Sequence, residues 1–419
     1  MKKLFAFFLA FALFCLSACN IGPSAGTSGN GGVQGTPNTP NGENWQDAVK
    51  DQVICSRFGS GLIDLPSRIV FADRTGSRTY YYSKADGKAY DYCMDPLCDH
   101  TDNTCLASPD EFGSGWYFES TCFYKDRFYS STGYGQIFSF AFDGSDRRIE
   151  YDAGYDKESL KGNVWSLPSD VYGPYMYILW KADEQGNPHT LRFNMETREM
   201  EDLTEKTGNY IEPVYFYNGI IYGTGNFYKT GNTRFKADMD LNTVELDEDP
   251  ASLFYASGSV VIGEAYGDEL DKYGYPVPIG MAMRDHKTGE SWTVLNETLG
   301  VEDWRIAAVT KEHIYFYDPS ILKIGSTIDH KGKEWPVQKM NDGKLYRINL
   351  DGTGLVCVFD DPNYELGTDT AIYDGYLVMQ GRYIVVENGE TKVWGGMIQV
   401  AVINEDGTIG EFKEVELVS

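Results

Sequence analysis

One pattern of apolar and polar positions recurs along the chain from about residue 80 to the C-terminus. A short run of alternating apolar and polar residues leads into a turn rich in Asp, Asn, Gly and Thr, and a second short alternating run follows. This pattern predicts a β-hairpin, because Asn, Asp and Gly tolerate the positive φ angles of tight turns. The seven instances are residues 80–88, 137–145, 191–197, 235–243, 281–289, 345–353 and 400–408.

A second strand pair precedes most of these hairpins. Its instances are residues 213–223 and 372–379, with less regular copies at 122–129 and 312–317. Each unit of about 50 residues therefore carries about four strands, which is typical of a β-propeller blade. Because one such sheet cannot bury both faces alone, we expect the units to stack around a ring.

The predicted fold class is therefore all-β, with a propeller of about seven four-stranded blades formed by residues 45–419. Six or eight blades stay open, since the first blade and the ring closure are the least regular parts. Two unrelated β-sandwiches are the alternative, because they also contain short strands with regular turns. Seven hairpins with one shared pattern favour the ring.

The N-terminus has the features of an export signal. Lys2 and Lys3 precede an apolar run at residues 4–16, which is too short to span a bilayer. Ser17 and Ala18 then precede Cys19, and this box resembles the cleavage site of bacterial lipoproteins. The resemblance implies that residues 1–18 are removed and that Cys19 carries the lipid, on the extracytoplasmic face of the cell membrane. In the alternative, Cys19 is an incidental thiol within a cleaved signal peptide.

Residues 19–44 form a predicted tether between this anchor and the head. They consist mainly of Gly, Ser, Thr, Asn and Pro, with almost no large apolar residue. Such a segment cannot bury enough surface to offset its chain entropy, so we expect disorder. As a flexible chain it reaches about 25–30 Å on average.

Composition narrows the class of partner. The formal net charge of −26 repels nucleic acid and anionic lipid, and it leaves neutral glycans, metal ions or basic peptides as partners. Solubility alone also explains such a surface. The 30 tyrosines fit a β-rich protein, because aromatic side chains pack well on a pleated sheet. Beyond the lipid anchor, the expected partners are a glycan or an envelope protein, and the chain is expected to be a monomer.

The blade sequence Leu-Tyr-Arg-Ile-Asn-Leu-Asp-Gly-Thr at residues 345–353 resembles TolB-type propellers. The whole chain, from signal through tether to ring, resembles propeller surface lipoproteins of Gram-positive anaerobes. The segment 93–105 also resembles an element found after the first blade in that group. The resemblance implies a fold and a surface location, and it identifies no functional residue beyond Cys19.

A cysteine-rich segment follows the first predicted blade. Cys93, Cys98, His100 and Cys105 offer three thiolates and one imidazole within a short stretch. Outside the cytoplasm cysteines mostly form disulfides, so we favour Cys98 with Cys105 and Cys93 with Cys122. A zinc site made of Cys93, Cys98, His100 and Cys105 is the minority alternative, because its spacing does not match a common structural site. Free thiols are the third possibility.

A calcium loop is a weaker possibility. Asp238, Asp240 and Asn242 have the spacing of an EF-hand loop that ends at Asp249. Thr243 stands where the sharp turn requires Gly, and the twelfth position is Asp rather than Glu. The same residues also form one of the repeated hairpin turns. We therefore expect no cofactor, with zinc or calcium as minor alternatives.

No common catalytic motif is present. The sequence lacks a Gly-x-Ser-x-Gly elbow, a His-Glu-x-x-His pair and a P-loop. His286 falls in a predicted hairpin turn and His313 opens a predicted strand, so both are explained as structural or solvated residues. Since sequence hides the separation between carboxylates, no glycosidase pair is assigned, and no catalytic residue is predicted.

Propeller ligands bind to loops at one end of the ring, so long insertions are candidate contact regions. The longest are residues 93–115, 263–278 and 319–340. The second mixes carboxylates with Tyr266, Tyr273 and Tyr275, which are the candidate ligand-contact residues. A solvated loop with tucked aromatics explains the same composition.

The hypothesis for function is a lipid-anchored extracytoplasmic propeller that acts as a binding or scaffolding module rather than as an enzyme. One alternative is a propeller enzyme acting on carbohydrate, either a glycosidase or a lyase. The other is an envelope assembly or signalling component whose ring docks a second protein. Parallel exposed aromatic faces indicate a glycan binder, a close pair of carboxylates indicates the enzyme, and a broad apolar patch indicates docking.

Overall fold

The structure is a computed structural model of the chain. It describes residues 46, 49–55, 62–65, 68–72, 79–91, 93, 122–131, 135–141, 146, 148–154, 170–181, 188–228, 231–247, 252–328, 333–373, 375–387, 390–404, 408–415 and 417–418. Residues 1–45 lie outside the described residues, so the predicted signal peptide, the predicted lipid site at Cys19 and the predicted tether stay predictions.

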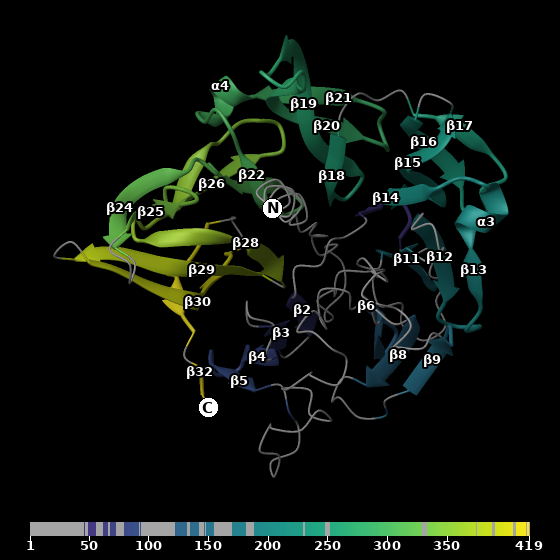
Figure 1. Cartoon of the computed structure of the whole chain (residues 1–419), viewed down its shortest axis with the longest axis horizontal. Coiled ribbons are helices and arrows are strands. Elements are labelled where there is room, and N and C mark those ends of the chain that lie inside the picture. Colours follow the sequence, from purple (N-terminus) through teal and green to yellow (C-terminus); the bar gives the residue numbers. More distant parts are fainter. Residues whose placement is uncertain are drawn as a thin grey trace.

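The described strands form seven sheets of four or five strands and one separate two-stranded hairpin. The larger sheets follow one another around a ring, and we number them as blades 1 to 7 in chain order (Figure 1). Blade 1 contains β2 (Leu62–Leu65), β3 (Arg68–Ala72), β4 (Thr79–Ser83), β5 (Ala89–Asp91) and the C-terminal β32 (Leu417–Val418). Blade 2 contains β6 (Cys122–Tyr124), β7 (Arg127–Ser131), β8 (Gln136–Ala141) and β9 (Arg148–Asp152). Blade 3 contains β10 (Asp170–Tyr172), β11 (Tyr175–Lys181), β12 (Pro188–Asn194) and β13 (Met200–Asp202).

The remaining four blades follow in chain order. Blade 4 contains the N-terminal β1 (Val53–Cys55), β14 (Ile211–Tyr217), β15 (Ile220–Tyr228), β16 (Gly231–Asp238) and β17 (Val244–Leu246). Blade 5 contains β18 (Ser252–Ser257), β19 (Val260–Leu270), β20 (Pro276–Asp285) and β21 (Ser291–Leu295). Blade 6 contains β22 (Arg305–Val309), β23 (His313–Tyr317), β26 (Lys344–Asn349) and β27 (Val356–Asp360), with the separate hairpin β24 (Leu322–Ile328) and β25 (Glu334–Lys339) inserted before β26. Blade 7 contains β28 (Tyr364–Tyr373), β29 (Tyr376–Glu387), β30 (Glu390–Val402) and β31 (Lys413–Glu414).

The predicted all-β propeller is confirmed, because the sheets are arranged radially and not as stacked layers (Figure 1). The sandwich alternative is therefore wrong. The seven larger sheets are those of the described residues, and the blade number of the complete ring stays a prediction.

Two faces of the ring follow from the meander. In blades 4 to 7 the first of the four meander strands (β14, β18, β22 or β28) lies nearer the ring centre than the later meander strands (Figure 1). Since successive strands are antiparallel, the turns from first to second strand and from third to fourth strand share one face, which we call the turn face. The hairpins between second and third strands and the connections between blades share the opposite face, which we call the hairpin face.

The repeated turns form as the sequence predicts, on the turn face. Asn194 Oδ1 accepts the backbone N–H of Glu196 at 2.9 Å, and Asp285 Oδ1 accepts that of Lys287 at 2.9 Å. Asp351 Oδ1 accepts the N–H of Thr353 at 2.9 Å. These side chains replace backbone partners within the turn, which explains the recurrence of Asn and Asp. The turns at 142–145 and 405–407 lie outside the described residues.

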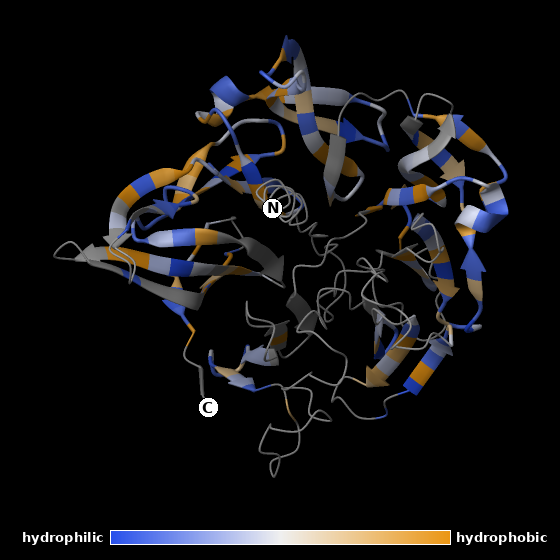
Figure 2. Cartoon of the chain, viewed as in Figure 1, coloured by the Kyte–Doolittle hydropathy of each residue, from blue (hydrophilic) through white to orange (hydrophobic). Residues whose placement is uncertain are grey.

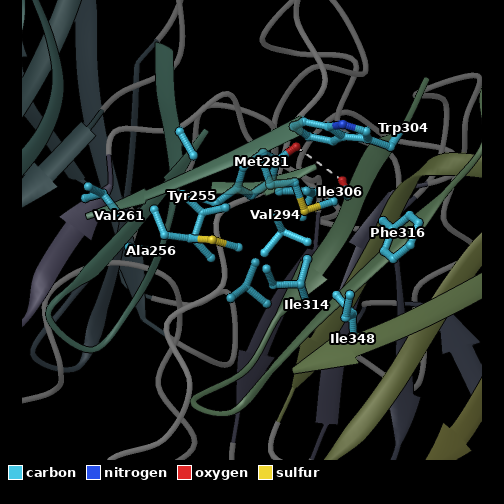
Figure 3. Packing of buried hydrophobic residues seen from close by; sticks show 14 of the residues in the cluster. Tyr255, Ala256, Val261, Met281, Val294, Trp304, Ile306, Ile314, Phe316 and Ile348 are labelled. Carbon is cyan, nitrogen blue, oxygen red and sulfur yellow. Dashed lines mark hydrogen bonds between the residues drawn. The ribbon is translucent and has the colours of Figure 1, made fainter. Parts of the chain in front are cut away.

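The core lies between neighbouring blades. Figure 2 shows hydrophobic and hydrophilic positions alternating along the strands. The largest cluster of the described residues joins Tyr255, Met281 and Val294 of blade 5 to Ile306 and Phe316 of blade 6 (Figure 3). It extends to Tyr215 and Tyr222 of blade 4. Other clusters join blades 2 and 3, blades 3 and 4, blades 6 and 7, and blades 7 and 1. In these clusters the apolar side chains of one blade are buried against those of the neighbouring blades.

Both ends of the described chain add a strand to a blade. β1 pairs antiparallel with β14, the innermost of the four meander strands of blade 4. β32 pairs parallel with β5 at the outer edge of blade 1, next to blade 7 (Figure 1). The C-terminal strand thus joins the last part of the chain to the first blade.

Two short helices of the described residues connect blades. α3 (Leu203–Thr207) leads from blade 3 to blade 4, and α4 (Asn296–Leu299) leads from blade 5 to blade 6. Asp202 caps α3 by accepting the backbone N–H of Glu205 at 2.9 Å. Among the described residues, no helix has the length and apolar character needed to span a membrane.

Candidate binding site on the hairpin face

The inner strands of blades 4 to 7 share an irregularity near their N-terminal ends. Strand pairing shifts between Pro213 and Tyr215, between Leu253 and Tyr255, between Ile306 and Ala308, and between Leu366 and Thr370. Such bulges turn side chains away from the regular alternation and are frequent beside functional sites. Because each inner strand begins at the hairpin face, this face has a specialised inner rim over four adjacent blades.

Two glycines allow the inner strands to approach their neighbours at these bulges. A Cβ at Gly223 of β15 would overlap the backbone oxygen of Glu212, and one at Gly381 of β29 would overlap that of Glu365. Only glycine therefore fits at either position without a shift of the backbone. The two glutamates occupy the same place in their blades, second in β14 and second in β28.

Glu212 is a half-buried carboxyl group on this rim. Tyr210 donates its hydroxyl hydrogen to Glu212 Oε2 at 3.3 Å. Burial raises the pKa of Glu212 above its ordinary value of 4.5, against the opposing effect of hydrogen bonds from Tyr210 and Thr224. Burial together with the Glu212 carboxylate also raises the pKa of Tyr210. This environment suits a Glu212 carboxyl group that holds a proton or that binds a hydroxyl group of a ligand.

Replacing Glu212 by glutamine is expected to raise the melting temperature at pH 7.5 and to leave it unchanged below about pH 4. A raised pKa in the folded state means that the folded protein binds the proton more tightly than the unfolded chain does. The stability that Glu212 contributes is therefore greatest below pH 4.5, the ordinary pKa of the group. It falls as the pH rises toward the pKa of Glu212 in the folded protein. Thermal unfolding at both pH values checks this. The exposed Glu312→Gln is the control, and an equal gain at both pH values for Glu212→Gln would contradict the assignment.

A second polar group joins blades 5 and 6 at the same face. Tyr266 donates its hydroxyl hydrogen to Glu264 Oε2, and Arg305 Nη1 lies 3.7 Å from Glu264 Oε1. Arg305 is the first residue of the inner strand β22, and its side chain is 49% exposed. A carboxylate, a phenol and an accessible guanidinium therefore meet where two blades adjoin.

The hairpin of β19 and β20 carries two further tyrosines. Tyr273 and Tyr275 are 72% and 69% exposed, between the ends of the two strands. Asp271 Oδ1 accepts the backbone N–H groups of both tyrosines, at 2.8 and 2.9 Å, and Gly274 has a φ of +86°. The hydrogen bond from the Tyr275 amide contributes most to lowering the pKa of Asp271. The turn is thus held in one conformation while the rings face solvent.

Most exposed large apolar side chains of the described residues lie on this face. Those on the hairpin face or at strand ends that meet it are Leu246, Leu270, Tyr273, Tyr275, Ile279, Leu295, Ile321, Leu322 and Met340. They belong to blades 4, 5 and 6 and to the inserted hairpin. Exposed apolar groups gathered in one region indicate a contact surface.

The inserted hairpin of β24 and β25 is held to blade 7 by a polar network. Glu365 Oε1 accepts from Arg382 Nε at 2.6 Å, and Glu365 Oε2 accepts from Arg382 Nη2 at 3.0 Å and from the Met340 backbone N–H at 2.8 Å. Asn341 Nδ2 donates to the Leu366 carbonyl at 2.8 Å, and its Oδ1 accepts the Leu366 N–H at 3.1 Å. The network fixes the hairpin as an extension of the hairpin face.

The structure changes one detail of the predicted contact loop. Residues 263–278 are not an irregular loop: they form the outer parts of β19 and β20 with a short turn between them. Tyr266 lies within β19 and is half-buried, whereas Tyr273 and Tyr275 are exposed. His286 lies in the turn from β20 to β21 and His313 opens β23, as the sequence indicates. Arg305, Glu365 and Arg382 belong to no motif, so the sequence does not identify them as site residues.

The cysteine predictions largely fall on residues outside the described ones. These include Cys98, His100 and Cys105, and the side chain of Cys122. No disulfide joins any two of the described residues. The pairs Cys98–Cys105 and Cys93–Cys122, and the alternative zinc site, stay predictions.

The predicted calcium loop forms a hairpin turn. Asp238 Oδ1 accepts the backbone N–H groups of Asp240 and Asn242 at 2.9 and 3.2 Å, and Asp238 Oδ2 accepts that of Thr243 at 2.7 Å. Within the part of the chain that the structure describes, no group of three or more His, Cys, Asp or Glu side chains could hold a metal ion. Asp249 lies outside the described residues.

No family model matches the sequence, and no curated protein matches it. Similar solved structures include an oligogalacturonate lyase from Vibrio parahaemolyticus, with 11% identity, coverage of 85% of this chain and 93% of that chain, and a TM-score of 0.41. They also include a putative TolB from Agrobacterium tumefaciens, with 10% identity, coverage of 67% and 87%, and a TM-score of 0.33. The β-propeller domain of the trilobed protease from Pyrococcus furiosus has 10% identity, coverage of 68% and 87%, and a TM-score of 0.34. Likeness at this level assigns neither a ligand nor an activity to this chain.

Proposed function

We propose that the protein is an extracytoplasmic propeller, anchored by a lipid on Cys19, that binds its ligand with the hairpin face. The exposed pair Tyr273 and Tyr275 is the observation that carries this proposal. Aromatic rings held in a fixed turn provide large contact area with little loss of side-chain entropy on binding. Their support by Asp271 distinguishes them from tyrosines that are exposed on a loose loop.

We further propose a glycan as the ligand. Tyrosine rings stack on the apolar faces of sugars, and the exposed carboxylates of Asp268 and Glu269 on the same hairpin can accept hydrogen bonds from sugar hydroxyls. The strong negative charge of the chain disfavours nucleic acid and acidic polymers. A neutral polysaccharide meets all of these conditions. A glycan array probed with residues 45–419 tests this class of ligand.

The double variant Tyr273→Ala with Tyr275→Ala is expected to bind the array ligand about thirtyfold more weakly or worse, since two central aromatic contacts at about 1–2 kcal/mol each contribute about 2–4 kcal/mol together. Titration calorimetry with the array hit measures the loss. Ile149→Ala is the matched control, because Ile149 is 64% exposed on the outer strand of blade 2. Unchanged affinity in the double variant would remove the tyrosines from the site.

Docking of an envelope protein is the second candidate, favoured by the apolar neighbours of the tyrosine pair. Leu270, Ile279 and Leu295 are 62%, 40% and 44% exposed on the same blade. Aliphatic side chains contribute more to a protein interface than to a sugar site. Docking would be favoured if the protein bound no glycan on the array and if Leu270→Asp abolished its binding to a purified envelope protein.

A carbohydrate-active enzyme is the third candidate, favoured by Glu212. A general acid near neutral pH needs a carboxyl group whose pKa is raised by burial, and Glu212 has that property. Glu264 of the next blade is the carboxylate to test as its partner. Cleavage of a polysaccharide by the wild-type protein, lost in Glu212→Gln and in Glu264→Gln, would establish this activity.

A further inference from the structure

The route of residues 49–55 determines which face of the ring lies next to a membrane that holds the N-terminus. We propose that the turn face lies toward the membrane and that the hairpin face points away from it, toward ligands outside that membrane. This inference rests on the N-terminal anchor of the proposed function. It adds the orientation of the site and the side from which the ligand comes.

Asp51 ties the N-terminal segment to the turn face. Its backbone N–H donates to Asn218 Oδ1 at 2.9 Å, and Asn218 Nδ2 donates to Asp51 Oδ1 at 3.2 Å. Lys287 Nζ lies 3.5 Å from Asp51 Oδ2. Asn218 is in the turn from β14 to β15, and Lys287 is in the turn from β20 to β21. Both turns belong to the turn face, so Asp51 does as well.

From Asp51 the chain runs into the ring. Val53 pairs with Tyr217, the last residue of β14 before its turn, and Cys55 pairs with Tyr215, further from the turn. The backbone N–H of Val53 also donates to the carbonyl of Gly258, in the turn from β18 to β19. Residues 49–51 therefore enter β1 from the turn face.

Two buried side chains fix this route. Val49 and Val53 are each 1% exposed. Val49 packs in the cluster between blades 3 and 4, and Val53 packs in the cluster that joins blades 4, 5 and 6. Because burying apolar side chains away from water is favourable, the two valines together resist displacement of the segment.

The distance between the two faces is large enough for the orientation to matter. The ten residues of β20 run from the tyrosine turn to the turn face, which corresponds to about 30 Å at roughly 3.3 Å per residue. The predicted tether reaches about 25–30 Å on average. The tyrosine pair therefore sits about one tether length further from the membrane than the turn face does.

This orientation selects among the ligands that exposed tyrosines suit. Tyrosines with leucine and isoleucine neighbours also occur at membrane interfaces, where the ring sits among lipid headgroups. A turn face held toward the membrane keeps Tyr273 and Tyr275 away from the lipid of the anchoring membrane. The ligand is then a polymer or a surface that approaches from the opposite side.

The C-terminal strand provides a matched control. β32 is parallel to β5, with Leu417 opposite Ala89 and Val418 opposite Tyr90. β5 follows the turn at residues 84–88 and runs from the turn face toward the hairpin face. The chain therefore leaves blade 1 in the direction of the hairpin face, so a C-terminal tether should reverse the orientation.

The test measures energy transfer from each face to a membrane. The mature chain, with a hexahistidine segment in place of Cys19, is bound to phosphatidylcholine vesicles that contain a nickel-chelating lipid and an acceptor-labelled lipid. A donor dye is attached through an azido side chain that replaces either Tyr273 on the hairpin face or the exposed Lys311 in the turn from β22 to β23. A companion protein carries the hexahistidine segment after residue 419.

With the N-terminal tether, transfer from position 311 is expected to exceed transfer from position 273 about twofold or more, because the faces lie about 30 Å apart. With the C-terminal tether, the order is expected to reverse. Equal transfer from both positions on the N-terminal tether would overturn the inference, and so would the same order with both tethers. The native anchor is tested separately by mass spectrometry of Cys19. An unacylated Cys19 would refute the anchor, whereas the vesicles still decide the orientation.

Discussion

Replacing Phe216 by alanine is expected to lower the free energy of unfolding by about 3–5 kcal/mol, the range for a large buried aromatic side chain. Phe216 is fully buried in β14 of blade 4. Its ring centroid lies 4.8 Å from that of Tyr172 and 5.0 Å from that of Tyr177, both of blade 3. Because the core lies between blades, the cavity would weaken the packing of blade 3 against blade 4. It would weaken the individual sheet of either blade less.

Urea denaturation followed by tryptophan fluorescence measures this change. The matched control is Leu246→Ala in the same blade, where the side chain is 45% exposed, and its expected effect is within about 0.5 kcal/mol. A loss below about 1 kcal/mol for Phe216→Ala would mean that the blades hold together without this aromatic contact.

The second large effect is expected at the base of the inserted hairpin. Glu365→Ala removes the acceptor of Arg382 and of the Met340 amide, and we expect a loss of about 2–4 kcal/mol. The Glu365 side chain is 6% exposed and that of Arg382 is 35% exposed, so the value lies at or below the usual range for a fully buried pair. The cost arises from the lost ion pair and from the Met340 amide and the partly exposed Arg382 guanidinium, which both lose their acceptor.

The pair Lys236 and Glu245 is the matched control for this prediction. Its N–O distance is 2.9 Å, and its side chains are 42% and 59% exposed. Glu245→Ala is expected to cost about 0–1 kcal/mol, because water screens an exposed ion pair. Glu365→Ala should also speed proteolytic cleavage between residues 322 and 339, and Glu245→Ala should not. Equal resistance of both variants would show that the hairpin does not depend on the Glu365 network.

The local hairpins could be predicted because their causes are local. Asn194, Asp285 and Asp351 each hold a turn through a backbone N–H two residues further along the chain. The alternating strands beside them depend only on the period of two. Seven such units require a radial arrangement, because no unit can bury both of its faces alone.

The candidate site could be predicted only in part. Tyr273 and Tyr275 were identified from the composition of their segment, and their exposure agrees with a contact role. Glu212 and Arg305 carry no motif, since each is a single polar residue at the start of a strand. The one available signal was the recurrence of a charged residue near the start of the inner strand in blades 4, 6 and 7.

The sequence by itself determined the strand class, the repeated hairpins and the predicted address at the N-terminus, because turn chemistry, alternation and signal motifs act over a few neighbouring residues. The tertiary structure decided where β1 and β32 join the ring, which carboxyl group is buried and which face receives the N-terminal segment. Asp51 and Asn218 are 167 residues apart in sequence. Such contacts arise from the closure of the ring and the packing of blade on blade, and no local pattern specifies them.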